Sequence, residues 1–345
     1  MARLVRVRGR FAATVVRLAA IVGLALVAVS GSVGLTPGTA RTAPSSAPRP
    51  APAAFGASAT PRSGCGTPAA AGTRTITPVL AGHVREVRVH LPAGYSPDRP
   101  VPVLLNLHGS GSTAAKQESQ TGLDGTADAH GFLVAYPQGI RASGTGFGWN
   151  IPGTPTFTSS GPDDTGFLSG LITVLRHEFC VDPTRVYASG FSGGARMVSQ
   201  LACTPGVRLA GIVAAGGLRA PSPCHPAYPL AVLAFHGTAD QSNPFNGHGQ
   251  SYWTYGVPEA AARWAGTDGC PARAHTSRPY PEVTLTDYQG CAGGAEVSLY
   301  ALTGKGHRWP AASGAFQPNE IAWRFLAGHS APGAGTPTPG ATHAA

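Results

Sequence analysis

The sequence predicts an α/β fold, with a mostly parallel sheet and helices on both of its faces, on the strength of three observations. Continuous apolar runs of strand length, such as Val101–Leu107 and Leu230–His236, are typical of parallel strands buried on both faces. Segments with apolar residues at helical spacing, such as Thr165–Phe179, lie between such runs. Polar residues directly follow several of the strand-like runs, at the carboxyl ends where parallel sheets hold their sites.

The first expected elements alternate in this way. Val87–Leu91 is a short run of strand-forming residues, Val101–Leu107 is continuously apolar, and Leu133–Tyr136 is a further apolar run. Thr165–Phe179 is expected to be a helix, because its Leu, Ile and Phe residues recur every three or four positions. Pro183 follows closely and cannot continue a helix.

The second half continues the alternation. The expected strand Arg185–Ser189 leads through a glycine-rich turn into the expected helix Ala195–Cys203. Gly211–Ala215 and Leu230–His236 are apolar and strand-like. The remaining expected elements are a helix at Glu259–Gly266, strands at Val283–Tyr288 and Val297–Leu302, and a closing helix at Asn319–Leu326.

Both ends of the chain differ in composition from this body. Residues 1–43 join an arginine-rich, acid-free start to the apolar run Leu18–Val33, as in a cleaved secretory signal peptide. Residues 44–62 are expected to form a Pro/Ala-rich linker and residues 329–345 a disordered tail, because such compositions cannot bury a core. We therefore expect a secreted, extracellular protein with one folded domain over residues 63–328.

A retained membrane anchor is the alternative for the first segment. Its apolar run is short for a hydrocarbon layer of about 30 Å and is interrupted by Gly and Ser, so we expect no stable membrane association after cleavage. Removal of residues 1–43 also removes six arginines and no acid, which lowers the formal net charge from +9 to +3. A weakly basic body without Lys/Arg runs argues against nucleic acid as a partner.

The six cysteines all lie in the body of the chain. An even number in an exported chain predicts three disulfides, for which sequence alone leaves 15 connectivities. Pairing of nearest neighbours favours Cys203–Cys224 and Cys270–Cys291 and leaves Cys65–Cys180. A zinc site is the rival explanation, but the chain has no C-x-x-C motif and its histidines are not spaced as ligands, so we expect no metal.

The segment Gly190-Phe191-Ser192-Gly193-Gly194 matches the G-x-S-x-G motif. In a glycine-rich chain the motif alone is a weak signal, and an inert serine in a glycine turn is the alternative. Here, however, it follows a strand-like run and begins a helical one, as a nucleophile elbow requires. The pattern predicts that Ser192 projects its hydroxyl above the sheet as a nucleophile.

A serine hydroxyl needs a base, and the base needs an orienting acid. Asp240 is the preferred acid because it ends the loop after an apolar strand; Asp268 and Asp287 are rivals. His307 is the preferred base because it lies downstream of that acid in a glycine-rich loop that also follows a strand. A histidine packed in the core is the alternative explanation for it, and His275 lies in a polar stretch.

Acyl transfer also needs hydrogen-bond donors for the developing oxyanion. The backbone N–H of Gly193, directly after the nucleophile, is one expected donor, and the N–H of Ser110, in the loop after Val101–Leu107, is the other. Trp149 and Trp309 are predicted to line the substrate cleft. A loop aromatic that covers the core is the alternative for Trp149.

The stretch GPDDTGFLSGLITVLRHEFCVDPTRVYASGFSGGARM resembles the poly(3-hydroxybutyrate) depolymerase-like esterases, which share an α/β-hydrolase fold with the feruloyl esterases of carbohydrate esterase family one. The likeness to secreted feruloyl esterases is carried by short elements across residues 64–327. These are Gly64-Cys65-Gly66, Cys180, Cys203, Cys224, Asp268-Gly269-Cys270, Gly290-Cys291 and the segment GKGHRWP at residues 304–310.

At matching positions the resemblance implies Ser192 as nucleophile, Asp240 as orienting acid and His307 as base. The family pattern SNGGMM or SYGGMM appears here as SGGARM, and two of the three differences concern the site. Gly193 lacks the side chain that follows the nucleophile, and Arg196 puts a charge where the pattern has an apolar residue. Both departures affect which acyl group the site accepts.

Together these features predict a secreted serine esterase of the feruloyl esterase type that acts on plant cell-wall polysaccharide esters, as a monomer and without a cofactor. The alternative substrate is a hydroxyalkanoate oligomer. A second alternative is acyl transfer to a sugar or cell-wall alcohol, which the same three residues would serve. A third is a wall-binding module that retains the fold without catalysis.

Overall fold

The computed structural model describes residues 63–249 and 251–333, which belong to one compact unit. The predicted signal peptide (1–43), the linker (44–62) and the end of the predicted tail lie outside these residues. The first part of that tail, residues 329–333, packs on the body, because Ala331 donates its N–H to the Thr184 carbonyl and is only 4% exposed. Within the described ranges, no helix has the length and apolarity needed to cross a bilayer.

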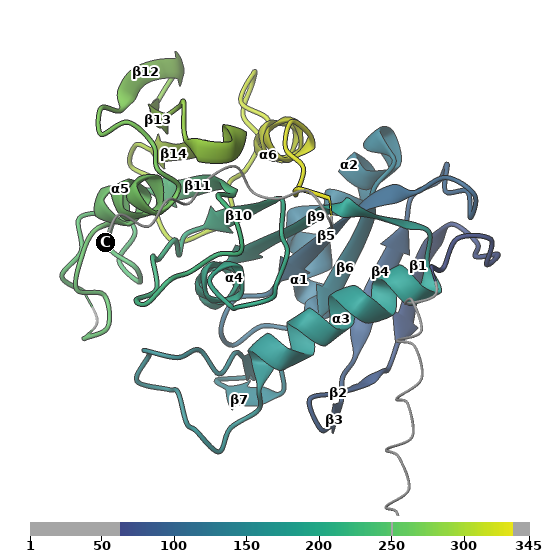
Figure 1. Cartoon of the computed structure of the whole chain (residues 1–345). Coiled ribbons are helices and arrows are strands. Elements are labelled where there is room, and N and C mark those ends of the chain that lie inside the picture. The colour runs from purple at the N-terminus through teal and green to yellow at the C-terminus, as the bar shows by residue number, and fades with distance from the viewer. Residues whose placement is uncertain (1–62, 250, 334–345) are drawn as a thin grey trace, which may run out of the picture. The chain divides into compact units, whose positions relative to one another are not determined.

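The central sheet has ten strands, and its inner six are parallel (Figure 1). Two antiparallel strands extend it at each edge. This confirms the prediction of a mostly parallel sheet. In spatial order the strands are β1 (Gly72–Ile76), β4 (Val87–Leu91), β6 (Leu133–Pro137), β5 (Val101–Leu107), β9 (Val181–Phe191), β10 (Gly211–Ala215), β11 (Ala231–Gly237), β14 (Val297–Leu302), β13 (Val283–Tyr288) and β12 (His275–Tyr280).

Helices cover both faces of the sheet (Figure 1). On one face the buried apolar side chains come from α3 (Asp164–Glu178), α4 (Gly193–Ala202) and α5 (Val257–Thr267). On the other face they come from α1 (Ala114–Thr121), α2 (Leu123–His130) and α6 (Pro318–Ala327). The alternation of strand side chains divides the core in the same way, because Val103 and Leu105 point to the first layer and Leu104 to the second.

The elements that were not predicted are polar or short. The edge strands β1 and β12 are largely exposed or half-buried, so their sequences lack the apolar run of a central strand. Helix α1 has a polar sequence and buries few of its residues. Two short hairpins were also missed; they are β2 (Val79–Leu80) with β3 (His83–Val84), and β7 (Arg141–Ser143) with β8 (Gly146–Gly148).

Three disulfides are present, with the connectivity favoured by nearest-neighbour pairing. Cys65–Cys180 joins the start of the body to the residue that precedes β9. Cys203–Cys224 and Cys270–Cys291 close shorter loops next to α4 and α5. No cysteine is left free.

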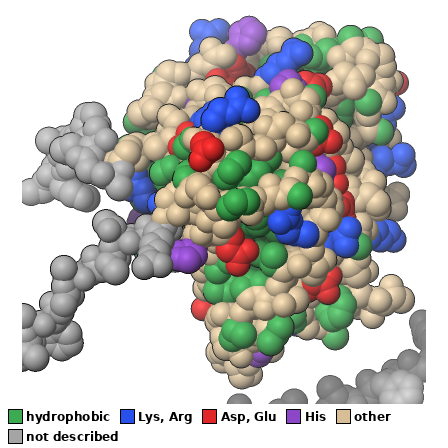
Figure 2. Space-filling view, turned by 90° about the vertical axis from the view of Figure 1, so that its right-hand side faces the viewer, with side chains coloured by type: hydrophobic (Ala, Val, Ile, Leu, Met, Phe, Trp, Pro, Cys, Tyr) green, Lys and Arg blue, Asp and Glu red, His purple; other side chains and the backbone are tan. Residues whose placement is uncertain are grey.

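The surface at the β1 edge carries charges of both signs. On the face that Figure 2 shows, Lys and Arg side chains lie scattered among acidic and apolar ones. This face therefore offers no continuous basic surface of the kind that binds a nucleic-acid backbone.

Candidate active site

Ser192 lies on the sharp turn between β9 and α4, in a backbone conformation that side chains rarely adopt (φ 52°, ψ −111°). Its N–H donates to the carbonyl of Ala215, which anchors the turn to the neighbouring strand β10 (2.9 Å). The flanking glycines are required by close backbone packing. A Cβ on Gly190 would lie 2.5 Å from the carbonyl carbon of Gly194, and one on Gly194 would lie 2.2 Å from the Leu107 oxygen.

His307 joins the serine to an acid in one hydrogen-bonded line. Its Nε2 lies 2.8 Å from the Ser192 Oγ, and its Nδ1 lies 2.7 Å from the Asp240 Oδ2. The ring also packs against Phe191, with 4.8 Å between ring centroids. Because His307 follows β14 and Asp240 follows β11, parallel pairing of these strands brings the two loops to one edge of the sheet.

Asp240 is buried, with 4% of its surface exposed. Burial by itself would raise the pKa of its carboxyl, but hydrogen bonds from His236, His307 and the Asn243 N–H, together with the charge of His307, hold that pKa well below its usual range. The Oδ1 atom also accepts from the Ser242 N–H (2.9 Å). The carboxylate is therefore kept ionised and fixed in orientation, as an acid that aligns an imidazole must be.

The rival acids and base lie elsewhere. Asp268 is fully buried at the end of α5, where it accepts the Leu230 N–H. Asp287 accepts the hydroxyl of Ser298 within the sheet, and His275 is exposed on the edge strand β12. None of them contacts Ser192.

Gly193 and Ser110 lie side by side, since a Cβ on Gly193 would be 3.0 Å from the Ser110 nitrogen. Neither backbone N–H has a hydrogen-bond partner among the described residues. Gly193 begins α4, where helix N–H groups lack intrahelical acceptors and the helix dipole favours negative charge. The pair is thus positioned to hold an oxygen that becomes anionic beside Ser192.

His108 fixes the loop that carries Ser110, a role that the sequence analysis did not assign to it. Its Nδ1 donates to the Gly109 carbonyl (2.9 Å), and its Nε2 accepts from the Gly139 N–H (3.0 Å). Burial lowers the pKa of His108 to about 4, so the ring is neutral at physiological pH. Its place directly after strand β5 was the available sequence signal.

Trp149 and Trp309 do not line a substrate cleft, which corrects the prediction for both. Trp149 is 1% exposed and donates its Nε1–H to the His108 carbonyl (2.8 Å), so it supports the Ser110 loop from beneath. Trp309 is 7% exposed and packs in the second layer of the core, with its Nε1 3.3 Å from the Asn319 Oδ1. Closeness in sequence to His307 suggested a cleft residue, but the chain turns the Trp309 indole inward.

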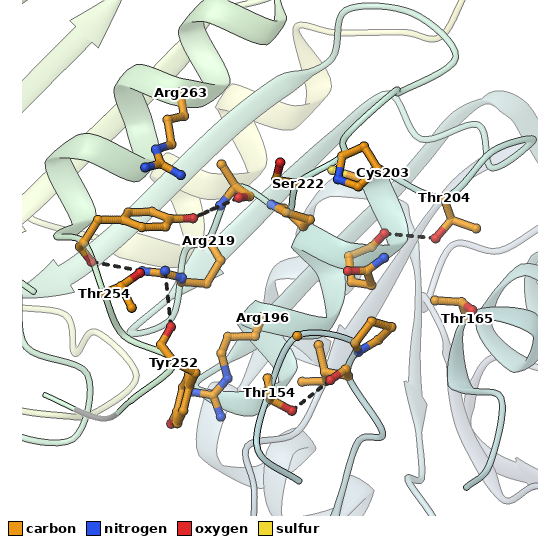
Figure 3. Close-up of a pocket in the computed structure, with 18 of the residues that line it drawn as sticks. Thr154, Thr165, Arg196, Cys203, Thr204, Arg219, Ser222, Tyr252, Thr254 and Arg263 are labelled. Carbon is orange, nitrogen blue, oxygen red and sulfur yellow. Dashed lines mark hydrogen bonds between the residues drawn. The ribbon is translucent and has the colours of Figure 1, made fainter. Parts of the chain in front are cut away.

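One cavity of about 730 Å³ lies beside α4 (Figure 3), and another of about 570 Å³ lies beside the loop after His307. Neither is lined by Ser192 or His307 themselves. The His307 side chain is 21% exposed, so solvent reaches this imidazole. Among residues 63–249 and 251–333, no group of three or more His, Cys, Asp or Glu could hold a metal ion.

Comparison with known proteins identifies the family. The family described as "Esterase PHB depolymerase" matches residues 86–228. The protein named "Putative esterase NocK" from Nocardia uniformis subsp. tsuyamanensis is 32% identical over 266 residues, covering 70% of this chain and 75% of that protein. The chain belongs to the PHB depolymerase-like esterase family. This esterase is accordingly a serine carboxylic-ester hydrolase, as the sequence analysis predicted.

Two further comparisons bear on the esterase. Feruloyl esterase B from Piromyces equi is 30% identical over 266 residues, which are 72% of this chain but 46% of that longer protein. The solved acetyl xylan esterase from Aspergillus awamori superposes with a TM-score of 0.56 at 14% identity, over 74% of this chain and 99% of that one. This structural likeness shows the shared α/β-hydrolase fold.

Proposed function

We propose that Ser192, His307 and Asp240 are the catalytic triad of an esterase that acts on plant cell-wall polysaccharide esters of the feruloyl type. The observation that carries the triad is the hydrogen-bonded line from the Ser192 hydroxyl through both nitrogens of His307 to the Asp240 carboxylate. The substrate class is supported by the relatives named as feruloyl esterase and acetylxylan esterase. A second proposal, that Gly193 and Ser110 donate to the oxyanion, is supported by their unpartnered, adjacent N–H groups.

In this mechanism His307 Nε2 takes the Ser192 proton as Oγ attacks the ester carbonyl carbon. The negative charge that forms on the carbonyl oxygen is held by the N–H groups of Gly193 and Ser110. Collapse breaks the bond to the alcohol oxygen, which receives the proton from His307. A water molecule, deprotonated by His307, then attacks the carbonyl carbon of the acyl-serine. The acid is released, and Ser192 recovers its proton from His307.

Three disulfides support a further proposal, that the enzyme works outside the cell, because such bonds persist in oxidising compartments. The whole proposed triad and both oxyanion donors come from one chain, which supports action as a monomer. Mass measurement in solution and assay of the culture medium of an expressing strain test these two proposals.

The decisive experiment compares wild type with Ser192→Ala on methyl ferulate, p-nitrophenyl acetate and hydroxybutyrate oligomers. We expect kcat to fall by about 10⁴-fold or more in the variant, because a triad without its nucleophile retains only the oxyanion hole and binding. Ser119→Ala, on the exposed side of α1, is the matched control. Equal rates for wild type and Ser192→Ala would contradict catalysis by this serine and leave only a binding role for the protein. Faster hydrolysis of the hydroxybutyrate oligomers than of methyl ferulate would contradict the feruloyl ester as the substrate class.

The same assay with an added alcohol tests acyl transfer. A hydrolase releases the free acid from the acyl-serine even when glycerol or xylose is present, whereas a transferase forms the new ester instead. We expect the free acid as the main product.

A further inference from the structure

The cavity beside α4 combines positive charge with a lining that contains no acid (Figure 3). Its volume is about 730 Å³, and it lies between the outer side of α4, the segment after β10 and the loop before α5. Three arginines line it, namely Arg196, Arg219 and Arg263, whereas no Asp or Glu among the described residues does. Such an imbalance inside a recess attracts an anion.

Arg196 lies on α4, the helix that begins directly after Ser192. It lies four residues after Ser192 on α4, which is a rise of about 6 Å along the helix. Its Nη1 donates to the Asn243 Oδ1 (3.1 Å), and its guanidinium lies over the Tyr252 ring, 5.1 Å from the centroid. Its Nε is buried without a hydrogen-bond partner. Burial lowers the pKa of Arg196, because no neighbouring carboxylate offsets the lost hydration.

Arg219 is held rigidly in the same wall. Its guanidinium stacks on the ring of Tyr255, 3.4 Å from the centroid, and lies 4.5 Å from that of Trp253. Its Nη1 donates to the Tyr255 carbonyl (2.9 Å) and its Nη2 to the Tyr252 carbonyl (3.4 Å), so two of its five N–H groups have carbonyl acceptors. Burial is the main cause that lowers the pKa of Arg219, and the positive charges of Arg263 and Arg196 lower it further.

Arg263 is different because it already has a carboxylate partner. Its Nη2 lies 2.7 Å from the Glu259 Oε1 on the exposed side of α5. The uncompensated charge of the cavity therefore comes from Arg196 and Arg219.

We propose that this cavity binds a carboxylate carried by the ester substrate, one helical turn from the nucleophile. The guanidinium groups of Arg196 and Arg219 line the cavity and have no carboxylate partner among the described residues, so they offer the planar, charged donors that the two oxygens of a carboxylate prefer. The hydroxyl-bearing residues Thr154, Ser222 and Thr254 and the aromatic residue Tyr252 also line the cavity, and they suit the polar or aromatic body of such an acid. This inference rests on the proposed function, since it assigns a substrate class to the same site.

The test uses two aryl acetates that differ only in charge, 4-acetoxyphenylacetate and its neutral amide 4-acetoxyphenylacetamide. We expect kcat/KM of the wild type to be about tenfold or more higher for the carboxylate at low ionic strength, since a charge-assisted hydrogen bond in a partly dry site is at least that strong. In Arg196→Met, which restores the apolar residue of the family pattern, and in Arg219→Met the ratio should fall to about one. Arg278→Met removes the same charge from the exposed strand β12 and should keep the wild-type ratio.

A binding measurement makes the result independent of turnover and of variant folding. In Ser192→Ala with both arginines intact, calorimetric titration should show tighter binding of 4-hydroxyphenylacetate than of 4-hydroxyphenylacetamide. Equal kcat/KM for the two esters in an active wild type, together with equal binding of the two ligands, overturns the carboxylate site and leaves the esterase standing. Failure of the wild type to hydrolyse either ester counts against the proposed function instead, and the titration still decides the site.

Discussion

At the scale of single residues, Asp240 is the group on which the proposed mechanism depends most closely. It accepts from His307 on one oxygen and from the Ser242 and Asn243 N–H groups on the other. The Nε2 of His236 adds a further contact at 3.3 Å. These donors explain why the buried Asp240 carboxyl stays ionised. Because the carboxylate accepts from the Nδ1 of His307, that nitrogen carries the proton and Nε2 is free to accept one from Ser192.

Replacement of Asp240 by Asn tests this role. We expect Asp240→Asn to lower kcat on p-nitrophenyl acetate by about 10⁴-fold, because an amide in this place favours the wrong tautomer of the imidazole. Asp287→Asn changes a rival acid that contacts Ser298 rather than the triad, and should keep kcat within a few-fold of wild type. Similar losses in both variants would show that general destabilisation, not proton alignment, is responsible.

One physical rule explains why the sequence indicated the residues of the proposed triad. Ser192, Asp240 and His307 each follow a strand-like run, and in a parallel sheet the ends of such runs meet at one edge. Trp149 and Trp309 were misplaced, because the direction of a loop side chain depends on tertiary packing that leaves no periodic signal. The supporting role of His108 also depends on packing, since Gly139, which donates to its Nε2, lies in a different loop, after β6.

At the scale of elements, the elbow between β9 and α4 requires close approach of three backbone segments. The Gly194 Cα faces the carbonyl oxygens of Leu107 and His108, which lie at the end of β5 and the start of the Ser110 loop. The same glycine therefore sets the position of the nucleophile and the position of its proposed oxyanion donor.

A methyl group at Gly194 should damage both stability and activity. We expect Gly194→Ala to lower the free energy of unfolding by about 1–3 kcal/mol or more, since the new Cβ would lie 2.2 Å from a backbone oxygen that cannot rotate away. kcat should also fall, because the Ser110 loop must shift. Gly125→Ala, in α2 with no atom within 4 Å of the new Cβ, should raise the unfolding free energy by about 0.5–1 kcal/mol. Urea unfolding and p-nitrophenyl acetate assays measure both, and a harmless Gly194→Ala would contradict the packing argument.

Helices and strands were predictable where their burial requires a regular pattern of apolar residues in the sequence. The inner strands are buried on both faces and read as apolar runs, so β5, β10 and β11 were found nearly to the residue. The edge strand β12 has the sequence HTSRPY, which is mostly exposed, and its strand conformation comes from pairing with β13. Partners distant in sequence impose such elements, so no local signal marks them.

At the scale of the whole molecule, two buried groups link stability to pH in opposite directions. Burial lowers the pKa of His108 to about 4, so the unfolded chain binds the extra proton between about pH 4 and 6.5, and this part of the stability is lost as pH falls through that range. Burial raises the pKa of Asp268 to about 7, so the folded state holds the extra proton, and stability is lost as pH rises from about 4 through 7. The two contributions oppose each other between about pH 4 and 6.5.

The Asp268→Asn variant should separate the contribution of Asp268 to the pH dependence of stability from that of His108. The Asn oxygen can still accept the Leu230 N–H that ties the end of α5 to the start of β11, while the charge that burial opposes is removed. We expect unfolding free energies near those of wild type at pH 4, and a gain on the order of 2–4 kcal/mol at pH 8, from about 1.4 kcal/mol per pKa unit. Urea unfolding at pH 4, 6 and 8 measures this, with the exposed Asp98→Asn as control. A gain in unfolding free energy that does not depend on pH, or a loss at pH 8, would contradict this expectation. Either result would mean that groups other than Leu230 stabilise the Asp268 carboxylate in the folded protein. The opposed titrations of His108 and Asp268 would then not account for the pH dependence of stability.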